Sequence, residues 1–288
     1  MSFRTLNVCR GVRSTVGAYQ QQSYRLAAAA LRQKHTVVMV RHGESQWNLD
    51  NRFTGWHDIQ LSPKGETEAA AAGKLVADSG FKFDVAYTSY LKRAIKTCWH
   101  VLEQTDCMST PIKNAWQLNE RHYGALTGLD KQQTVEKHGK EQVLVWRRSY
   151  DIPPPPIDHS SPDYPGNDRK YAALSEKDIP DTESLATTLE RVLPYWKDVI
   201  VPDIKAGKQV VIAAHGNSLR ALVKHLDNIP EDVITGLNIP TGAPLVYEFD
   251  DNMKVIPSSE AIAPLQGKYL GDREDVLARI QGVANQTK

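Results

Sequence analysis

Apolar runs of strand length alternate with stretches of helical pattern along most of the chain. Residues 37–40, 85–88 and 208–214 are short apolar runs that end at polar turns, as buried strands do. Residues 66–79 and 219–226 have helical patterns, and a Ser-Pro pair before the first suits a helix start. Strands that alternate with helices predict an α/β fold, a three-layer sandwich with a mostly parallel central sheet flanked by helices.

The pattern becomes irregular between residues 115 and 181. Residues 134–148 look helical, but the four prolines at 153–156 are incompatible with regular structure. We therefore expect this segment to be an insertion that lies over one face of the main sheet.

Three more elements complete the predicted core. A long helix is expected from Thr182, with a kink at Pro194, and residues 245–249 are expected to form the last strand. Another helix begins after Ser89, and its apolar positions form one stripe. This stripe consists of Leu91, Ile95, Cys98, Trp99 and Leu102. We expect the whole stripe, Trp99 included, to pack in the core.

Charge is distributed unevenly along the 288 residues. The net charge is only +1, which gives no indication of a nucleic-acid partner, and no apolar run is long enough to predict a membrane span. Six basic residues and no acidic residue precede Thr36. An Arg-rich, Ser-containing, acid-poor N-terminus is typical of organelle transit peptides. We expect residues 1–34 to be a mitochondrial transit segment ahead of a catalytic domain at 35–288; an extension without a targeting role, in a cytoplasmic protein, is the alternative.

The cysteines and histidines do not predict a metal site. Cys9, Cys98 and Cys107 are odd in number and lack CxxC spacing, so neither a disulfide framework nor a zinc site is expected. No pair of histidines has HExxH spacing. We expect a protein without a metal, in a reducing compartment.

Two of the buried strands end in the same way. VVMV is followed by RHG, and VVIAA by HGNS, so His42 and His215 each come directly after a strand. Binding crevices form at the carboxyl ends of parallel strands, and a glycine lets the backbone approach a ligand closely. A single histidine after a strand is more often structural. The matched pair instead predicts one shared site.

Arginines near these histidines indicate an anionic ligand. Arg41 precedes His42, and Arg93 lies in the first turn of the helix after Ser89. Guanidinium groups bind phosphate oxygens in a bidentate manner. A neutral imidazole beside such a phosphate is a competent nucleophile, so the pattern predicts phosphoryl transfer.

Five segments carry a resemblance to a known family. RHGESQWN, SYLKRAIKT, LNERHYGALTG, VWRRSYDIPPPP and AAHGNSLRAL occur in this order, and the chain from Thr36 onward resembles the cofactor-dependent phosphoglycerate mutases of the histidine phosphatase superfamily. The resemblance implies that His42 becomes phosphohistidine, that His215 stabilises the transferring phosphoryl group, and that Glu120 is the general acid/base. It also implies that Arg41, Arg93 and Asn48 hold the phosphate, together with the backbone of Gly216 and Asn217. Without the resemblance, Glu120 would be read as a surface carboxylate in a loop.

The same resemblance implies which residues bind the end of the substrate that lies away from His42. The implied cationic set is Arg121, Lys131, Arg147 and Arg148, and the implied hydrogen-bonding set is Ser45, Thr54, Gly55 and Tyr123. Taken alone, Arg147 and Arg148 would be read as a solvated helix end favoured by the helix dipole. Gly55 is small enough to leave room for the substrate to reorient, which the resemblance associates with mutases.

The implied activity is interconversion of 3-phosphoglycerate and 2-phosphoglycerate, primed by 2,3-bisphosphoglycerate. The resemblance also implies a mobile tail at about 265–288 that covers the site, and a homodimer or homotetramer. A bisphosphoglycerate mutase or phosphatase on the same scaffold is the close alternative. A third hypothesis, an inactive relative that serves as a scaffold, predicts the loss of at least one main site residue, and none is lost.

Overall fold

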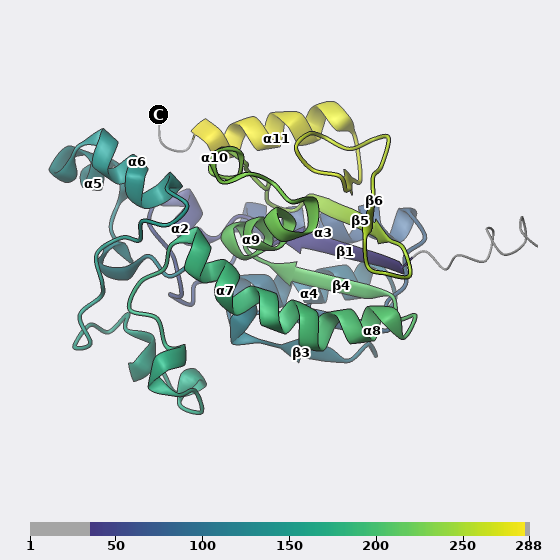
Figure 1. Cartoon of the computed structure of the whole chain (residues 1–288), viewed down its shortest axis with the longest axis horizontal. Coiled ribbons are helices and arrows are strands. Elements are labelled where there is room, and N and C mark those ends of the chain that lie inside the picture. Colours follow the sequence, from purple (N-terminus) through teal and green to yellow (C-terminus); the bar gives the residue numbers. More distant parts are fainter. Residues whose placement is uncertain (1–34, 286–288) are drawn as a thin grey trace, which may run out of the picture. The chain divides into compact units, whose positions relative to one another are not determined.

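The computed structural model describes residues 35–285, so the predicted transit segment lies outside the described residues. A single sheet forms the centre of this part of the chain. Its strand order is β3-β2-β4-β1-β5-β6, and β7 pairs with β5 (Figure 1). The strands are β1 His35–Arg41, β2 Val85–Thr88, β3 Ile112–Asn114, β4 Val210–Ala214, β5 Pro244–Phe249, β6 Val255–Ile256 and β7 Lys268–Tyr269.

The sheet is parallel on one side and antiparallel on the other. β1 pairs with β4, and β2 with both β4 and β3, in parallel register. β5 is antiparallel to β1, β6 and β7. The predicted α/β fold, a sheet flanked by helices, is confirmed, and the sheet is mixed because the last three strands along the chain pair in antiparallel register.

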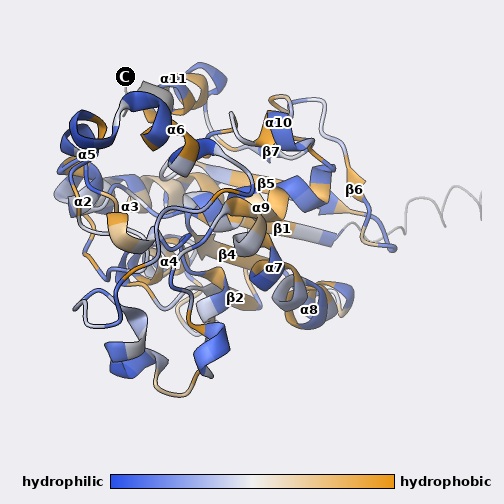
Figure 2. Cartoon of the chain, turned by 60° about the vertical axis from the view of Figure 1, so that its left-hand side comes forward, coloured by the Kyte–Doolittle hydropathy of each residue, from blue (hydrophilic) through white to orange (hydrophobic). Residues whose placement is uncertain are grey.

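Side chains alternate between two cores on opposite faces of the sheet. Along β1, Val37 and Met39 lie in the larger core, whereas Val38 and Val40 lie in the smaller one. This period of two makes both faces of the central strands apolar. The covering helices carry both hydrophobic and hydrophilic residues (Figure 2), as expected for helices that bury one side.

Two groups of helices make the outer layers. The smaller core packs against α3 Pro63–Asp78 and α4 Lys92–Gln104, and the larger core against α7 Leu185–Tyr195, α8 Val201–Lys205 and α9 Gly216–Asp227. Ser62 caps α3 by accepting a hydrogen bond from the Gly65 amide. The long helix predicted from Thr182 begins instead at Leu185, and a π-helical turn, Trp196–Ile200, separates α7 from α8 just after Pro194. Proline cannot donate the regular backbone hydrogen bond, which accounts for the irregularity there.

The irregular segment 115–181 lies beyond the carboxyl ends of β1 and β4 in Figure 1, rather than over a face of the sheet as expected. The single helix predicted at 134–148 is two helices, α5 Lys131–His138 and α6 Lys140–Arg148. Gly139 separates them with φ 81°, a conformation that ends a helix. The remaining short elements are α2 Gln46–Leu49, α10 Glu231–Ile234 and the 3₁₀ turns Trp116–Leu118, Gly124–Leu126, Pro165–Asn167, Arg169–Tyr171 and Glu176–Asp178.

Two features of the outer elements bear on the sequence predictions. Trp99 is 52% exposed, so its predicted burial was wrong, although Cys98 and Leu102 of the same stripe are buried. The C-terminal helix α11, Arg273–Asn285, buries Val276 in the larger core. Whether residues 265–288 move remains a prediction. Within the described residues, no helix is both long and apolar enough to cross a membrane.

Candidate active site

The two predicted histidines meet at the carboxyl ends of neighbouring strands. β1 and β4 pair in register up to Arg41 and Ala214, and the His42 amide continues the ladder by donating to the Ala214 carbonyl at 3.0 Å. The next residue along β4 is His215, and the two imidazole rings have their centroids 4.9 Å apart at 61°. The sheet register therefore sets the distance between the two histidines.

A backbone hydrogen bond determines the tautomer of His42. Its Nδ1 lies 2.6 Å from the Gly43 carbonyl oxygen, which can only accept, so Nδ1 carries the proton. Nε2 is then the unprotonated nitrogen, and it accepts from Nε of Arg93 at 3.3 Å. Burial, with the charges of Arg93 and Arg41, holds the pKa of His42 well below its usual value. A neutral imidazole with a free Nε2 lone pair is the form required of a nucleophile.

Arg93 and Arg41 are held on either side of this nucleophile. Arg93 is buried and donates to the carbonyl oxygens of His57 and Gly55 at 2.9 and 2.8 Å. Gly55 presents its carbonyl from a left-handed conformation, φ 53°, which glycine adopts without strain. Arg41 donates to the Ile239 carbonyl at 2.6 Å, and its buried Nε has no hydrogen-bond partner among residues 35–285. Burial lowers the pKa of Arg93 to about 10, which still leaves it charged at neutral pH.

His215, whose ring neighbours that of His42, is fully buried. Its Nε2 is 2.7 Å from the Ser89 hydroxyl, whereas its buried Nδ1 has no hydrogen-bond partner in the described part of the chain. Burial and the nearby Arg93 charge hold the pKa of His215 well below its usual value. An unpartnered buried nitrogen this close to His42 is free to interact with a group transferred to His42.

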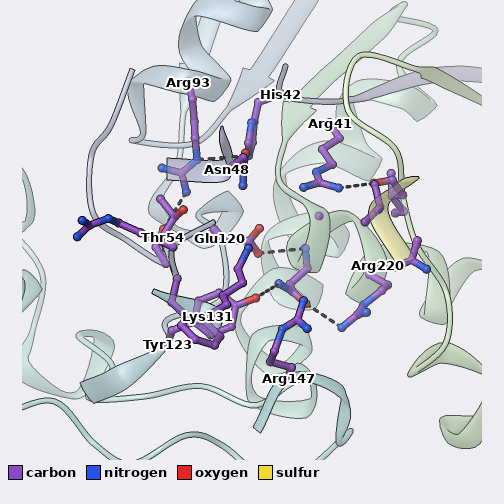
Figure 3. A pocket seen from close by; sticks show the side chains of 18 of the residues that line it. Arg41, His42, Asn48, Thr54, Arg93, Glu120, Tyr123, Lys131, Arg147 and Arg220 are labelled. Carbon is purple, nitrogen blue, oxygen red and sulfur yellow. Dashed lines mark hydrogen bonds between the residues drawn. The ribbon is translucent and has the colours of Figure 1, made fainter. Parts of the chain in front are cut away.

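Glu120 supplies the only carboxylate among the described residues that line the cavity. Its Oε1 accepts from the backbone amides of Arg121 and Asn217 at 2.8 and 3.0 Å. Asn217 lies in the first turn of α9, so the carboxylate is at a helix N-terminus, where a negative charge is stabilised. In the view of Figure 3, Glu120 lies between the group around His42 and the group around Lys131 and Arg147.

The far side of the cavity is strongly cationic. Lys131 and Arg147, from α5 and α6, face Tyr123, whose ring is stacked under Arg121 at 4.7 Å. Burial and the Arg147 charge lower the pKa of Lys131 to about 8. Burial favours the neutral phenol of Tyr123, but the charges of Arg121 and Arg147 outweigh it and lower the pKa of Tyr123 to about 8. Positive charges gathered at one side of a cavity favour an anion as its ligand.

Most residues predicted for the site line this cavity. They are Arg41, His42, Asn48, Thr54, Gly55, Arg93, Glu120, Tyr123, Lys131, Arg147, Arg148, Gly216 and Asn217. Ser45, Arg121 and His215 are buried next to it and do not line it. The Ser45 hydroxyl instead caps α2 and donates to Oδ1 of Asn48, which leaves the Asn48 amide nitrogen available to a ligand.

Several residues that line the cavity were missed from the sequence, among them two arginines and one residue of the C-terminal helix. Arg52 and Arg220 add positive charge, and Val283 comes from the C-terminal helix. Arg220 donates to Oδ1 of Asn217 at 2.8 Å, and burial together with the Arg121 charge lowers its pKa to about 9. Its position three residues after Asn217 on α9 was the available signal, because residues i and i+3 share a helix face.

His42, Glu120 and His215 also form a group whose ligand atoms lie within 4.8 Å of one another. Zinc ligands lie about 2 Å from the ion, so these atoms would have to move closer together to bind one. Arg41 and Arg93 would repel a cation at the same place. The absence of a metal therefore remains a prediction, and the surrounding charges favour an anion.

The mixed sheet, with an anion-binding cavity at the carboxyl ends of its parallel strands, is the arrangement of an α/β enzyme. A family model described as the histidine phosphatase superfamily (branch 1) matches residues 37–164 and 157–260. The chain belongs to this superfamily.

Solved structures share the fold at low sequence identity. A mycobacterial glucosyl-3-phosphoglycerate phosphatase in complex with VO3 is 21% identical, with a TM-score of 0.60 over 77% of this chain and 96% of that one. A protein described as an alpha-ribazole-5'-P phosphatase from Escherichia coli is 18% identical, with a TM-score of 0.59 over 83% of this chain and 96% of that one. YhfR from Bacillus stearothermophilus is 20% identical, with a TM-score of 0.57 over 77% and 94%. At these identities the similarity concerns the fold.

Proposed function

We propose that this enzyme interconverts 3-phosphoglycerate and 2-phosphoglycerate through a phosphorylated His42. One observation carries the proposal: among the described residues, the cavity that contains His42 is lined by seven arginines and lysines and a single carboxylate. The cations lie both beside His42 and beside Lys131, so a small substrate with an anionic group at each end fits the charges. Phosphoglycerate, with a phosphate and a carboxylate, is such a substrate.

The first transfer uses the groups around Glu120. The substrate hydroxyl gives its proton to Glu120 while its oxygen attacks phosphorus, and the bond between phosphorus and His42 Nε2 breaks. The product is 2,3-bisphosphoglycerate, and His42 is left neutral. Arg41, Arg93 and the amides at the start of α9 stabilise the charge on the transferring group.

The return transfer runs in the opposite sense with the other phosphate. Once the bisphosphate has reoriented, Nε2 of His42 attacks that phosphorus, the bond between phosphorus and substrate oxygen breaks, and Glu120 returns its proton to the oxygen. An unphosphorylated His42 has nothing to donate, so we propose 2,3-bisphosphoglycerate as the primer. This step needs no metal.

A phosphatase is the second candidate, because several of the similar structures are described as phosphatases. In that reaction water attacks the phosphohistidine, and inorganic phosphate is released. Val283 of the C-terminal helix lines the cavity, so we expect this helix to limit the access of water from that side. This contact supports the mutase.

The test measures 2-phosphoglycerate and inorganic phosphate formed from 3-phosphoglycerate, with and without 2,3-bisphosphoglycerate. We expect isomer formation that depends on the primer and is abolished in His42→Ala. The matched control is His159→Ala, because His159 is exposed and lies outside the cavity. Phosphate release faster than isomer formation would identify a phosphatase instead, and activity that survives in His42→Ala would exclude the phosphohistidine.

A further inference from the structure

A buried ion pair lies next to the site without lining the cavity. Arg191 on α7 donates from Nε to Oε1 of Glu183 at 2.5 Å, and their side chains are only 8% and 4% exposed. A buried ion pair adds little to stability by itself, because both charges lose their hydration. We therefore looked for the role of the pair in the groups to which it donates or from which it accepts hydrogen bonds.

Those groups are the backbone of the segment that carries Glu120. Arg191 donates to three carbonyl oxygens, those of Gln117 at 2.6 Å, Asn119 at 3.1 Å and Glu120 at 2.9 Å. Oε2 of Glu183 accepts from the amide of His122 at 2.7 Å. One ion pair thus binds four backbone groups of a stretch of six residues that has no regular structure beyond a single 3₁₀ turn.

The same segment is held at the other end by α9. The carboxylate of Glu120 accepts from the Asn217 amide, so α9 fixes the head of the side chain while α7 fixes its backbone. The guanidinium of Arg191 also lies 5.5 Å from the ring of Trp56, the residue after Gly55. A general acid must lie within hydrogen-bond distance of the oxygen it serves, so both attachments bear on its function.

We propose that Glu183 and Arg191 are positioning residues that hold Glu120 at the distance needed for proton transfer. This inference rests on the proposed function, in which Glu120 exchanges a proton with the substrate oxygen. Neither residue lines the cavity that contains His42. Loss of the pair frees three carbonyls and one amide at once, and the Glu120 backbone loses its attachment to α7.

The proton-transfer role can be separated from a general role in folding by varying the leaving group. Transfer from 2,3-bisphosphoglycerate to His42 expels an alkoxide, which needs the proton of Glu120. Transfer from 4-nitrophenyl phosphate expels nitrophenolate, which is stable without a proton at neutral pH. A misplaced acid slows the first reaction and leaves the second nearly unchanged, whereas partial unfolding slows both equally.

The experiment measures single-turnover phosphorylation of His42 by each donor in Glu120→Gln, Arg191→Ala, Arg191→Lys and Glu183→Gln. We expect Glu120→Gln and Arg191→Ala to lose about 10²-fold or more with the bisphosphate, the usual contribution of general acid catalysis, and only a few-fold with the nitrophenyl ester. Arg191→Lys and Glu183→Gln, which preserve part of the network, should lose less. The control is Asp203→Asn, which breaks a comparable network with Lys113, Lys208 and Tyr87 away from the cavity.

Chemical rescue gives a second measurement. A cavity of about 440 Å³ is lined by Arg191, Glu183 and Trp116, so it offers a path for a small cation to the vacated position. We expect millimolar guanidinium to restore part of the bisphosphate rate in Arg191→Ala and to leave Asp203→Asn unchanged.

The outcomes separate the two proposals. Equal losses with both donors in all Arg191 and Glu183 variants, as in Asp203→Asn, would overturn the positioning role while leaving the role of Glu120 intact. No selective loss in Glu120→Gln would instead overturn the proposed acid itself. If Arg191→Ala does not fold, the two conservative variants decide the question.

Discussion

At the scale of single residues, the hydrogen bond from His42 Nδ1 to the Gly43 carbonyl decides which nitrogen keeps a free lone pair. The same glycine allows the turn after β1 to approach α3. A Cβ placed on Gly43 would lie 2.1 Å from the Gly65 carbonyl oxygen, which is far inside contact distance. Backbone packing here leaves no space for any side chain.

Gly43→Ala should therefore lower the free energy of unfolding by about 2 kcal/mol or more, in the range of overpacking substitutions. Urea denaturation of the wild type and the variant measures this directly. Gly282→Ala is the matched control, because a Cβ at Gly282 meets no described atom within 4 Å. Equal stability of the two variants would contradict the close approach.

The titration of Lys131 and Tyr123 in the cavity predicts how substrate affinity depends on pH. The pKa values of Lys131 and Tyr123 are both about 8. Above pH 8 Lys131 loses its positive charge and Tyr123 gains a negative one, so both changes weaken the binding of an anion. We expect the dissociation constant for 3-phosphoglycerate to rise from pH 7 to pH 9.

Calorimetric titration at several pH values measures this dependence. Lys131→Arg with Tyr123→Phe should remove most of it, since neither new side chain titrates in this range. A wild-type dissociation constant that stays constant between pH 7 and 9 would show that these two groups keep their protonation state.

The sequence located many of these residues and missed others for physical reasons. His42, Glu120 and Arg147 occur in motifs, so the resemblance identified them. Arg220 was overlooked because its place in the site depends on the helix face that it shares with Asn217. The burial of Trp99 was wrongly predicted because the apolar stripe of α4 is wider than the helix face that the sheet covers.

At the scale of secondary-structure elements, the buried strands were predictable because both of their faces are apolar. The breaks inside helices were harder to predict. Gly139 lies within a stretch of helical pattern and ends α5 by its φ of 81°. A π-helical turn follows Pro194 in a helix that was expected only to kink. Whether a helix breaks at such a residue depends on how neighbouring elements pack against it. The hydrophobic periodicity of the sequence carries no information on that packing.

The C-terminal helix α11 provides a test of water exclusion. Ile280 packs at the edge of the larger core and Val283 lines the cavity. Ending the chain after Ile280 keeps the first contact and removes the second. We expect several-fold faster release of inorganic phosphate relative to isomer formation, because water gains access to the phosphohistidine.

The assay is the same measurement of isomer and inorganic phosphate on the shortened protein. Val283→Ala, which keeps the helix and removes only part of one side chain, should have a smaller effect. An unchanged ratio of the two products in the shortened protein would mean that α11 does not limit the access of water.

At the scale of the whole molecule, buried neutral histidines make the free energy of unfolding depend on pH. Burial lowers the pKa of His122 to about 4, and those of His42 and His215 also lie well below the usual value. Below about pH 6.5 the unfolded chain binds protons at these positions and the folded chain does not. Stability therefore falls as pH falls.

Each such histidine contributes a slope of at most about 1.4 kcal/mol per pH unit, so the three together contribute at most about 4 kcal/mol per unit. Urea denaturation between pH 7.5 and 5 should show a steep loss of stability. His159→Gln, at an exposed position, should leave the slope unchanged. A free energy of unfolding that is flat over this range would mean that the buried histidines take up protons in the folded state.

The fold class was predictable from the sequence, but the direction of the last strands and the placement of segment 115–181 were not. Alternating strands and helices indicated the α/β sandwich, whereas nothing in the local pattern of residues 244–249 indicated antiparallel pairing with β1. The placement of segment 115–181 at the carboxyl edge of the sheet depends on long-range contacts such as those of Arg191 with the backbone at 117–120.

The distance between His42 and His215 is set by paired strands, whereas Lys131 and Arg147 come from the short helices of segment 115–181. Under the proposed function, the histidine pair thus comes from the sheet and the distant cationic groups from the segment, which also carries Glu120. A lineage could replace the segment, and with it the preferred compound, while inheriting the histidine pair, provided that the new segment supplies a carboxylate in place of Glu120. For protein engineering, the corresponding segment of another superfamily member is the natural unit of exchange.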